Sequence, residues 1–279
     1  MKKRARARRI HPVSAVSIAA SDSGGGAGIQ ADLLTFAAHG VYGTTVIAAG
    51  TAQNTRGVRA VETFSTRFLG QQMDAVFEDF RPRAVKIGML FDRPRIRAVA
   101  QGLARHRARN VVLDPVMVSK SGARLLSPPA LGSLRRDLLP HCDLVTPNLP
   151  EAEALAGMRL RTDADRRLAC GVLADLGARA VLLKGGHRRG KEVRDLLFDG
   201  RFFTEFAAPR IRTLATHGTG CTLSAAIAAN LALGLGLEDA IVGAIGYLRA
   251  GLARGLFPGR GHGVPDHLAL LRPEDRGST

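Results

Sequence analysis

Two kinds of apolar segment alternate along this chain. Short runs rich in β-branched residues predict buried strands at 13–19, 44–49, 84–90, 110–113, 143–146 and 180–184. Between them, apolar residues recur at helical spacing and predict helices at 29–38, 68–77, 96–107, 128–138, 150–156, 165–176, 222–233 and 237–254. Parallel strands need such crossover helices, so the alternation favours a mostly parallel sheet with helices on both faces. We therefore predict an α/β fold.

A hairpin and an undivided chain complete the predicted organisation. Residues 193–198 and 201–206 predict a β-hairpin beside the sheet, because the Asp199-Gly200 dipeptide between them favours a tight turn. No Pro/Ser-rich linker or internal repeat interrupts the sequence, so we expect residues 13–270 to form one domain. Residues 1–12 are expected to be a disordered basic tail and residues 271–279 a C-terminal tail.

The charge of the chain first suggests a polyanionic partner. With 40 basic and 24 acidic residues the formal net charge is +16. Six of the positive charges lie in residues 1–9, and the others are spread along the chain. Trp is absent and Tyr occurs twice, so stacking platforms for single-stranded nucleic acid are scarce. We therefore expect no nucleic-acid partner, while a hydrophobic content of 46% excludes a disordered chain.

Cysteines and apolar runs bear on the cellular compartment. Cys142, Cys170 and Cys221 are odd in number and widely spaced, which argues against a disulfide framework and against a Cys-rich zinc site. No apolar run approaches the length of a membrane span, so we expect no membrane partner. Serines interrupt residues 10–20 too early for a signal peptide. The sequence predicts a cytoplasmic protein.

A first glycine-rich loop follows the first predicted strand. Residues 24–28 hold four glycines and precede a predicted helix. Glycines let the backbone approach a ligand closely, and a helix N-terminus attracts anions. A flexible turn explains the same residues equally well, so both interpretations stay open.

A second glycine-rich loop, at residues 216–222, is more specific. Gly218 and Gly220 free backbone N–H groups to converge on an anion, and the dipole of the helix that follows adds favourable potential. Cys221 falls at the start of that helix, where we expect a lowered thiol pKa. For Cys142 and Cys170 we expect small buried side chains instead. The loop thus predicts an anion site beside a reactive thiol.

Two standard nucleotide signatures are missing. No GxGxxG opens a helix after a strand, so a dinucleotide site is not supported. Residues 185–191 resemble the beginning of a P-loop. However, Glu192 stands where magnesium ligation needs Ser or Thr, and this interpretation is rejected.

Charged side chains follow several predicted strands. Asp114, Asn148 and Glu151 lie at strand ends and would suit Mg²⁺, which binds through one or two carboxylates, water and phosphate oxygens. Asn148 and Glu151 also have the spacing of a capping box, and both roles are compatible. Lys184 ends a strand and could hold a phosphate. We interpret Lys86 as an ordinary strand-edge lysine, with a much weaker claim to a phosphate than Lys184.

In order and number, the motifs resemble the hydroxymethylpyrimidine/phosphomethylpyrimidine kinases of the ribokinase-like superfamily. The resemblance spans roughly residues 13–267 and rests on SDSGGGAGIQADLLTF, TAQNTRGV, KIGML, LDPVMVSKSG, TPNLPEAEAL, LLKGGH and HGTGCTLSAAIAANLALG. It implies a three-layer ribokinase-like sandwich and ATP-dependent phosphorylation of 4-amino-5-hydroxymethyl-2-methylpyrimidine and of its monophosphate in thiamine biosynthesis. It further implies ATP as co-substrate, Mg²⁺ as cofactor and a homodimer.

The resemblance also assigns roles to individual residues. The pyrimidine would contact Ala20, Asp32, Gln53, Met89 and Val116. Cys221 would take the proton from the attacking alcohol, and charge on the transferred group would be received by Gly218, Gly220 and Lys184. ATP would lie near Lys184, His217 and Thr219, while Mg²⁺ would be held, partly through water, by Asp114, Asn148 and Glu151.

Some positions depart from the family pattern and keep alternatives open. Ala20 stands where relatives usually have Gly, Leu34 where they have Lys, and Arg212 where they have Asp. One methyl group beside a planar ring can shift it, so a pyridoxal or pyridoxine kinase is an alternative function. A non-catalytic pyrimidine-binding regulator is another. Gln53 favours the pyrimidine, since an amide both donates to and accepts from an aminopyrimidine edge.

Overall fold

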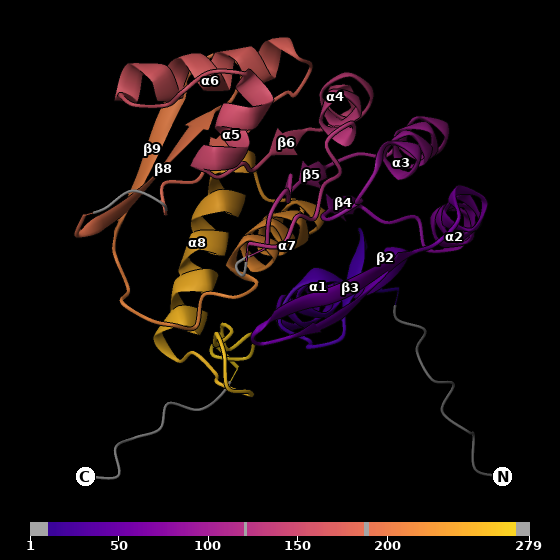
Figure 1. Ribbon diagram of the computed structural model, residues 1–279, viewed down its shortest axis with the longest axis horizontal. Coiled ribbons are helices and arrows are strands. Elements are labelled where there is room, and N and C mark those ends of the chain that lie inside the picture. Colours follow the sequence, from indigo (N-terminus) through magenta and orange to yellow (C-terminus); the bar gives the residue numbers. More distant parts are fainter. Residues whose placement is uncertain (1–10, 120–121, 187–189, 272–279) are drawn as a thin grey trace, which may run out of the picture.

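The strands of the protein form one continuous sheet. The computed structural model describes residues 11–119, 122–186 and 190–271, so most of the two predicted tails lies outside the described residues. Within these ranges the strand order is β3-β2-β1-β4-β5-β6-β7-β8-β9 (Figure 1). The strands are β1 (Ser14–Asp22), β2 (Tyr42–Asn54), β3 (Gly57–Thr63), β4 (Ala84–Ile87), β5 (Val111–Leu113), β6 (Leu144–Val145), β7 (Val181–Leu183), β8 (Glu192–Phe198) and β9 (Phe203–Pro209).

Helices connect the strands, as the alternating pattern predicted. They are α1 (Gly28–Ala38), α2 (Thr66–Asp79), α3 (Arg93–His106), α4 (Ala130–Ser133), α5 (Leu149–Ala156), α6 (Asp163–Asp175), α7 (Thr219–Ala232) and α8 (Leu237–Ala253). No helix in the described ranges is both long and apolar enough to cross a membrane.

The sheet is parallel at its centre and antiparallel at its edges. Neighbouring strands from β2 through β1 and β4 to β7 run parallel, whereas β3, β8 and β9 pair antiparallel. The chain steps from β1 to β2 in one direction and then returns to place β4 on the other side of β1. In open α/β sheets, ligands bind where the strand order reverses, outside the carboxyl ends of the strands. The topology therefore directs attention to the edge above β1 and β4.

Alternating side chains of the central strands supply two apolar cores. Val16, Val85 and Val145 pack on the side of α2 to α6. Their neighbours Ala15, Ala84 and Leu144 pack on the side of α7 and α8, with α1 alongside. Figure 1 shows α2 to α6 following one side of the sheet. The predicted three-layer arrangement is confirmed, and so is the hairpin, formed by β8 and β9.

Two elements differ from the prediction. β3 was missed because most of its side chains are at least partly exposed and it follows β2 after a short turn, so it lacks an apolar signal. The helix predicted at 128–138 is α4 followed by a π-helical turn (Leu134–Leu138) and a 3-10 turn (Leu139–His141). Pro140 lies in that last turn, and proline prevents a regular helix from continuing.

Candidate active site

One cavity of about 830 Å³ opens at the carboxyl ends of the parallel strands. It brings together side chains from the carboxyl ends of β1, β2 and β4, from the segments that follow β5, β6 and β7, and from the N-terminus of α7. Of the predicted site residues, all but one line it, namely Ala20, Gln53, Met89, Asp114, Val116, Asn148, Glu151, Lys184, His217, Gly218, Thr219, Gly220 and Cys221. The exception is Asp32.

An apolar wall forms one part of this cavity. Ala20 and Met89 belong to a small apolar cluster with Ala49 and Leu125, and Val116 packs against it. These residues come from the ends of β1, β2 and β4 and from the loop after β5. A flat ring with few charges would find its largest apolar contact here.

Asp22 organises the first glycine-rich loop. Its carboxylate accepts hydrogen bonds from the backbone N–H groups of Gly24 (2.8 Å), Gly26 (3.2 Å) and Ala27 (2.9 Å). The N–H groups that sequence reasoning offered to a ligand anion are thus bound to a side chain of the chain itself. Burial raises the pKa of Asp22, but hydrogen bonds from His217 and the loop outweigh burial and lower it. The loop is therefore a rigid turn rather than an open anion site.

His217 joins the two glycine-rich loops. Its Nε2 atom lies 3.1 Å from Asp22 Oδ2 and 3.1 Å from the terminal amide of Gln53. The family resemblance assigned His217 to the nucleotide. In the structure its imidazole ring instead contacts Gln53, a residue assigned to the pyrimidine. Ser23 exchanges two further hydrogen bonds, each 2.8 Å, with the backbone of Gln53.

The second loop packs directly against the first. Gly218 caps α7 with a positive φ of 77°, and a Cβ atom there would lie 1.8 Å from the carbonyl oxygen of Gly26. A Cβ at Gly26 would in turn lie 2.5 Å from the His217 ring. Only glycine permits both approaches. As a result, the N-termini of α1 and α7 meet at the cavity.

Cys221 lies where these two helix N-termini meet. The N–H of Gly28 at the start of α1 hydrogen-bonds to this partly buried cysteine. Burial nevertheless dominates and raises its pKa to about 11, although Lys86 and the Gly28 N–H act in the opposite direction. The predicted lowering of the thiol pKa is therefore wrong. The helix N-terminus is present as expected, but packing of α1 over α7 removes the water that a thiolate needs.

Asp32 and Lys86 differ most from their predicted roles. Asp32 is fully buried, and its Oδ2 atom accepts hydrogen bonds from Ser17 (2.5 Å) and from the Lys86 ammonium (2.7 Å). The Oδ1 atom is buried without a hydrogen-bond partner. Asp32 therefore cannot contact a ligand in this structure. Lys86 is not a strand-edge lysine but a completely buried one at the floor of the cavity, where β4 pairs with Ser17 of β1.

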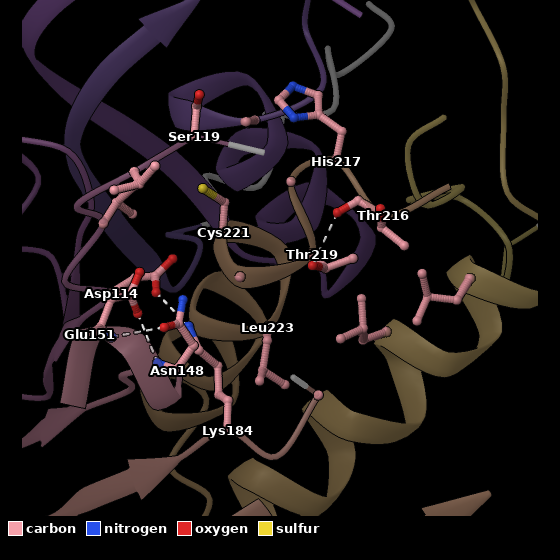
Figure 2. Close-up of a pocket in the computed structure, with 18 of the residues that line it drawn as sticks. Asp114, Ser119, Asn148, Glu151, Lys184, Thr216, His217, Thr219, Cys221 and Leu223 are labelled. Atoms are coloured by element: carbon pink, nitrogen blue, oxygen red, sulfur yellow. Dashed lines mark hydrogen bonds and ion pairs between the residues drawn. The ribbon is translucent and has the colours of Figure 1, made fainter. Parts of the chain in front are cut away.

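A charged cluster occupies another part of the cavity. Lys184 Nζ lies 2.7 Å from Asp114 Oδ1, and a Cβ atom on Gly220 would lie 3.0 Å from Asp114 Oδ2. Although burial lowers the pKa of Lys184, nearby carboxylates including Asp114 and Glu151 outweigh it and raise that pKa, which keeps the ammonium charged. Figure 2 shows this cluster on one side of Cys221 and His217 on the other.

Asn148 and Glu151 form the predicted capping box of α5. Asn148 Oδ1 accepts from the Glu151 N–H at 3.0 Å, and Glu151 Oε2 accepts from the Asn148 N–H at 2.8 Å. Burial raises the pKa of Glu151 to about 7, Lys184 opposes this rise, and the nearby charge of Asp114 adds to it. A second cation beside these carboxylates would relieve their repulsion. The donor set of two carboxylates thus fits a hard divalent ion that keeps water and phosphate ligands.

Sequence reasoning missed Asp22 and the true position of Lys86. Asp22 had a usable signal, since an aspartate directly before glycines is typical of a turn closed by its own side chain. The sequence signal for Lys86 was weaker. A lysine inside a short apolar strand is buried when that strand is central in the sheet, and a buried ammonium needs a charged partner. Its partner Asp32 was recognised but assigned to the ligand.

Comparison with known proteins gives matches over nearly the whole chain. The family model described as phosphomethylpyrimidine kinase matches residues 22–266. A hydroxymethylpyrimidine/phosphomethylpyrimidine kinase of Rhizobium meliloti (strain 1021) is 52% identical over 91% of this chain and 96% of its own length. Among solved structures, an ADP complex of Bacillus subtilis pyridoxal kinase has a TM-score of 0.87 and 35% identity over 94% of this chain and 100% of that chain. Phosphomethylpyrimidine kinase of Clostridium difficile 630 has a TM-score of 0.77 and 42% identity over 85% of this chain and 98% of that chain.

Proposed function

Because the chain belongs to the phosphomethylpyrimidine kinase family, we propose that it phosphorylates 4-amino-5-hydroxymethyl-2-methylpyrimidine and then its monophosphate, in thiamine biosynthesis. ATP, the co-substrate that a kinase of this family implies, supplies the phosphoryl group. One observation supports the proposal most: Cys221 lies at a helix N-terminus between an apolar wall with Gln53 and the charged cluster of Asp114, Glu151 and Lys184. A neutral ring and a polyphosphate each find suitable surroundings in one cavity.

The pyrimidine ring is proposed to lie against the apolar wall. Ala20, Met89 and Val116 offer it flat apolar contact, while the Gln53 amide offers one donor and one acceptor to its edge. In this position its hydroxymethyl group would be directed to Cys221. Asp32 has no place in this binding mode, since it is buried beneath the cavity.

The phosphates of ATP are proposed to lie between Lys184 and the start of α7. Phosphoryl transfer passes through a loose transition state, so positioning and electrostatic stabilisation dominate catalysis. Backbone N–H groups at Gly218, Gly220 and Cys221 and the ammonium of Lys184 would receive the charge of the transferred group. Apolar residues from α7, α8 and the loop before α7 line the rest of the cavity and offer a surface for the base: Ile211, Leu223, Ile245 and Leu248.

Cys221 is proposed to accept the proton of the attacking alcohol. With a pKa of about 11, nearly all of the thiol is neutral at pH 7 in the free protein. Only the thiolate form of Cys221 can accept the alcohol proton, and it becomes the neutral thiol when it does so. Lys86 favours that thiolate form, because its charge lowers the Cys221 pKa.

Asp114 and Glu151 are proposed to hold Mg²⁺, with Asn148 fixing Glu151 through the capping box. When bound, the ion would neutralise phosphate charge and orient the transferred group. Among the described residues no group of three or more His, Cys, Asp or Glu forms a metal site. The ion would consequently depend on phosphate oxygens for its other ligands, and its affinity should rise when ATP is present.

A pyridoxal kinase is the second candidate function. The observation in its favour is the TM-score of 0.87 to the Bacillus subtilis pyridoxal kinase. A coupled ADP-release assay with the aminopyrimidine, its monophosphate and pyridoxine as separate substrates decides between them, with mass spectrometry of each product. We expect kcat/KM for both pyrimidines to be at least about tenfold above that for pyridoxine, because pyridoxine would lose at least one hydrogen bond to the site. A pyridoxine value above both pyrimidine values would contradict the proposal.

We also propose an oligomeric state and a cellular location. A homodimer follows from the family resemblance, and sedimentation velocity measures it directly. A cytoplasmic location agrees with a requirement for ATP and with free cysteines at 142, 170 and 221.

A further inference from the structure

His217 links Asp22 to Gln53 at the wall of the substrate cavity. His217 Nε2 is 3.1 Å from Asp22 Oδ2 and 3.1 Å from the Gln53 amide, and all three side chains line the cavity. Asp22 and His217 have side chains that are 3% and 16% exposed. Their hydrogen bonds are therefore largely shielded from water, and their donors and acceptors must match.

The protonation of the imidazole nitrogen follows from Asp22. That carboxylate already accepts three backbone N–H bonds, and its lowered pKa keeps it ionised and unable to donate. His217 Nε2 must therefore carry a hydrogen and point it at Asp22. A nitrogen that carries this hydrogen cannot accept one from the Gln53 NH₂ group.

The Gln53 amide then has one consistent orientation. The structure has the amide nitrogen 3.1 Å from His217 Nε2, which sets two donors against each other, so we exchange the amide oxygen and nitrogen and place the oxygen at His217. After this exchange the NH₂ group takes the place of the oxygen that lies 3.4 Å from Thr51 Oγ1. The Thr51 hydroxyl donates to the Ser21 carbonyl at 3.1 Å and keeps a lone pair for the NH₂ group. No contact in the network then joins two donors, and one hydrogen of the Gln53 NH₂ group remains for a ligand.

We propose that Asp22 and His217 are positioning residues that fix the Gln53 amide with its oxygen towards His217, and so select the substrate ring. The proposal rests on the proposed function. A fixed amide presents one acceptor and one donor in a set order. It matches a ring edge on which a ring nitrogen lies beside an exocyclic amine, as in an aminopyrimidine. A pyridine ring without that amine leaves one amide group unpaired, which costs binding.

A double-mutant cycle tests this role. His217→Phe keeps an aromatic ring but removes the donor, and His217→Gln keeps an N–H. We expect His217→Phe to raise KM for the aminopyrimidine about three- to tenfold, the worth of one net hydrogen bond, with kcat and the KM for ATP within about twofold. His217→Gln should recover at least half of the loss on a logarithmic scale. In the Gln53→Ala background, His217→Phe should raise KM for the aminopyrimidine by less than a further factor of about two, because His217 acts through Gln53.

Several outcomes would overturn the role of His217. Equal losses from His217→Phe with and without Gln53 would mean that His217 acts independently, and a raised KM for ATP would return it to the nucleotide. Thermal unfolding of each variant separates these effects from a damaged fold, and an equilibrium titration of the aminopyrimidine replaces KM for any variant too slow to assay. If the unmodified chain fails to phosphorylate the aminopyrimidine, the proposed function itself is wrong. That failure is distinct, because it does not involve any variant.

Discussion

At the scale of single residues, burial decides the chemistry of this site more than residue type does. Cys221, Asp32 and Lys86 carry groups that in water would be a weakly acidic thiol, a free carboxylate and a free ammonium. In the fold, burial raises the pKa of Cys221 to about 11, and Asp32 and Lys86 pair with each other away from water. The three groups are electrostatically linked, because Lys86 stabilises charge on both of the others.

Removing the thiol should separate chemistry from binding. We expect Cys221→Ala to lower kcat at least ~100-fold while KM for the pyrimidine changes less than about threefold, since proton transfer is lost but ring contacts remain. Steady-state kinetics measures both values. Cys170→Ala, a buried cysteine of α6, is the matched control and should leave kcat unchanged. An unchanged kcat in Cys221→Ala would remove Cys221 from the mechanism.

The raised pKa predicts how Cys221 reacts with alkylating reagents. Only the thiolate reacts, and its fraction rises tenfold per pH unit until the pH reaches the pKa. We therefore expect the rate of Cys221 alkylation by iodoacetamide to rise about tenfold per unit from pH 7 to pH 10, without a plateau. Peptide mass spectrometry assigns the site, and Cys221→Ala supplies the background. A plateau near pH 8.5 would show an ordinary, unburied thiol.

Removing one partner of the buried Asp32–Lys86 ion pair should destabilise the protein far more than replacing both partners. Lys86→Met leaves the Asp32 carboxylate buried without its cation, which should lower the free energy of unfolding by ~3–5 kcal/mol. Adding Asp32→Leu should restore most of that loss, because no uncompensated charge remains. Urea unfolding measures both. Lys191→Met, at an exposed position, is the control and should change stability by less than ~0.5 kcal/mol.

At the scale of elements, the active site lies where the N-termini of α1 and α7 pack against each other. α1 follows β1 through the first glycine-rich loop, and α7 follows the second, so one helix comes from each end of the chain. Gly218 of the second loop contacts Gly26 of the first at a distance that only glycine allows. Their joint dipoles favour an anion at the place where the phosphoryl group would be transferred.

Glycines at the two ends of α7 provide a test of this packing. Gly218 and Gly234 both have positive φ, 77° and 95°, but a Cβ at Gly234 meets nothing within 4 Å. We expect Gly234→Ala to cost ~1–2 kcal/mol for its φ alone and to leave kcat unchanged. Gly218→Ala should cost more and lower kcat over tenfold, since α7 must move off the first loop. Equal effects of the two substitutions on kcat would contradict this role of the contact.

Elements were predicted better from the sequence than side-chain environments. Apolar runs located every central strand because those strands are buried on both faces, whereas the part-exposed β3 lacks such a run. The strand ends then placed Asp114, Glu151 and Lys184 at one edge correctly. The pKa of Cys221 could not be predicted, because it depends on α1, distant in sequence, covering the thiol. The Asp32–Lys86 pair was hidden for the same reason, since 54 positions separate its partners.

At the scale of the whole molecule, the net charge of +16 includes a group of arginines that lies far from the active site. A groove of about 440 Å³ lies beneath the amino ends of β4 and β5, opposite the active site, and is lined by Arg81, Arg83, Arg107 and Arg109. Helices α2 and α3 end there, and cations near helix C-termini are favourable. The positive charges of these arginines are therefore favourable at this place in the fold.

This assignment predicts a functionally silent surface. Replacing the four arginines of the groove together by glutamine should leave kcat and KM for both substrates within about twofold, because the groove and the cavity lie at opposite edges of the sheet. A lowered melting temperature, from weaker interaction with the helix termini, is the expected effect. A selective rise in the KM for ATP would instead indicate that the groove attracts the nucleotide.

The contact between Gly26 and Gly218 also limits how this enzyme can change by mutation. Each loop forms the surface on which the other rests, so a side chain introduced in one must be matched by a displacement of the other. The residues of the two loops therefore cannot vary independently of one another. Attempts to redirect the enzyme to new alcohols by directed evolution should recover few productive single substitutions in either loop. Libraries that randomise both loops together, or that leave both intact and vary the apolar wall, should be richer in active clones.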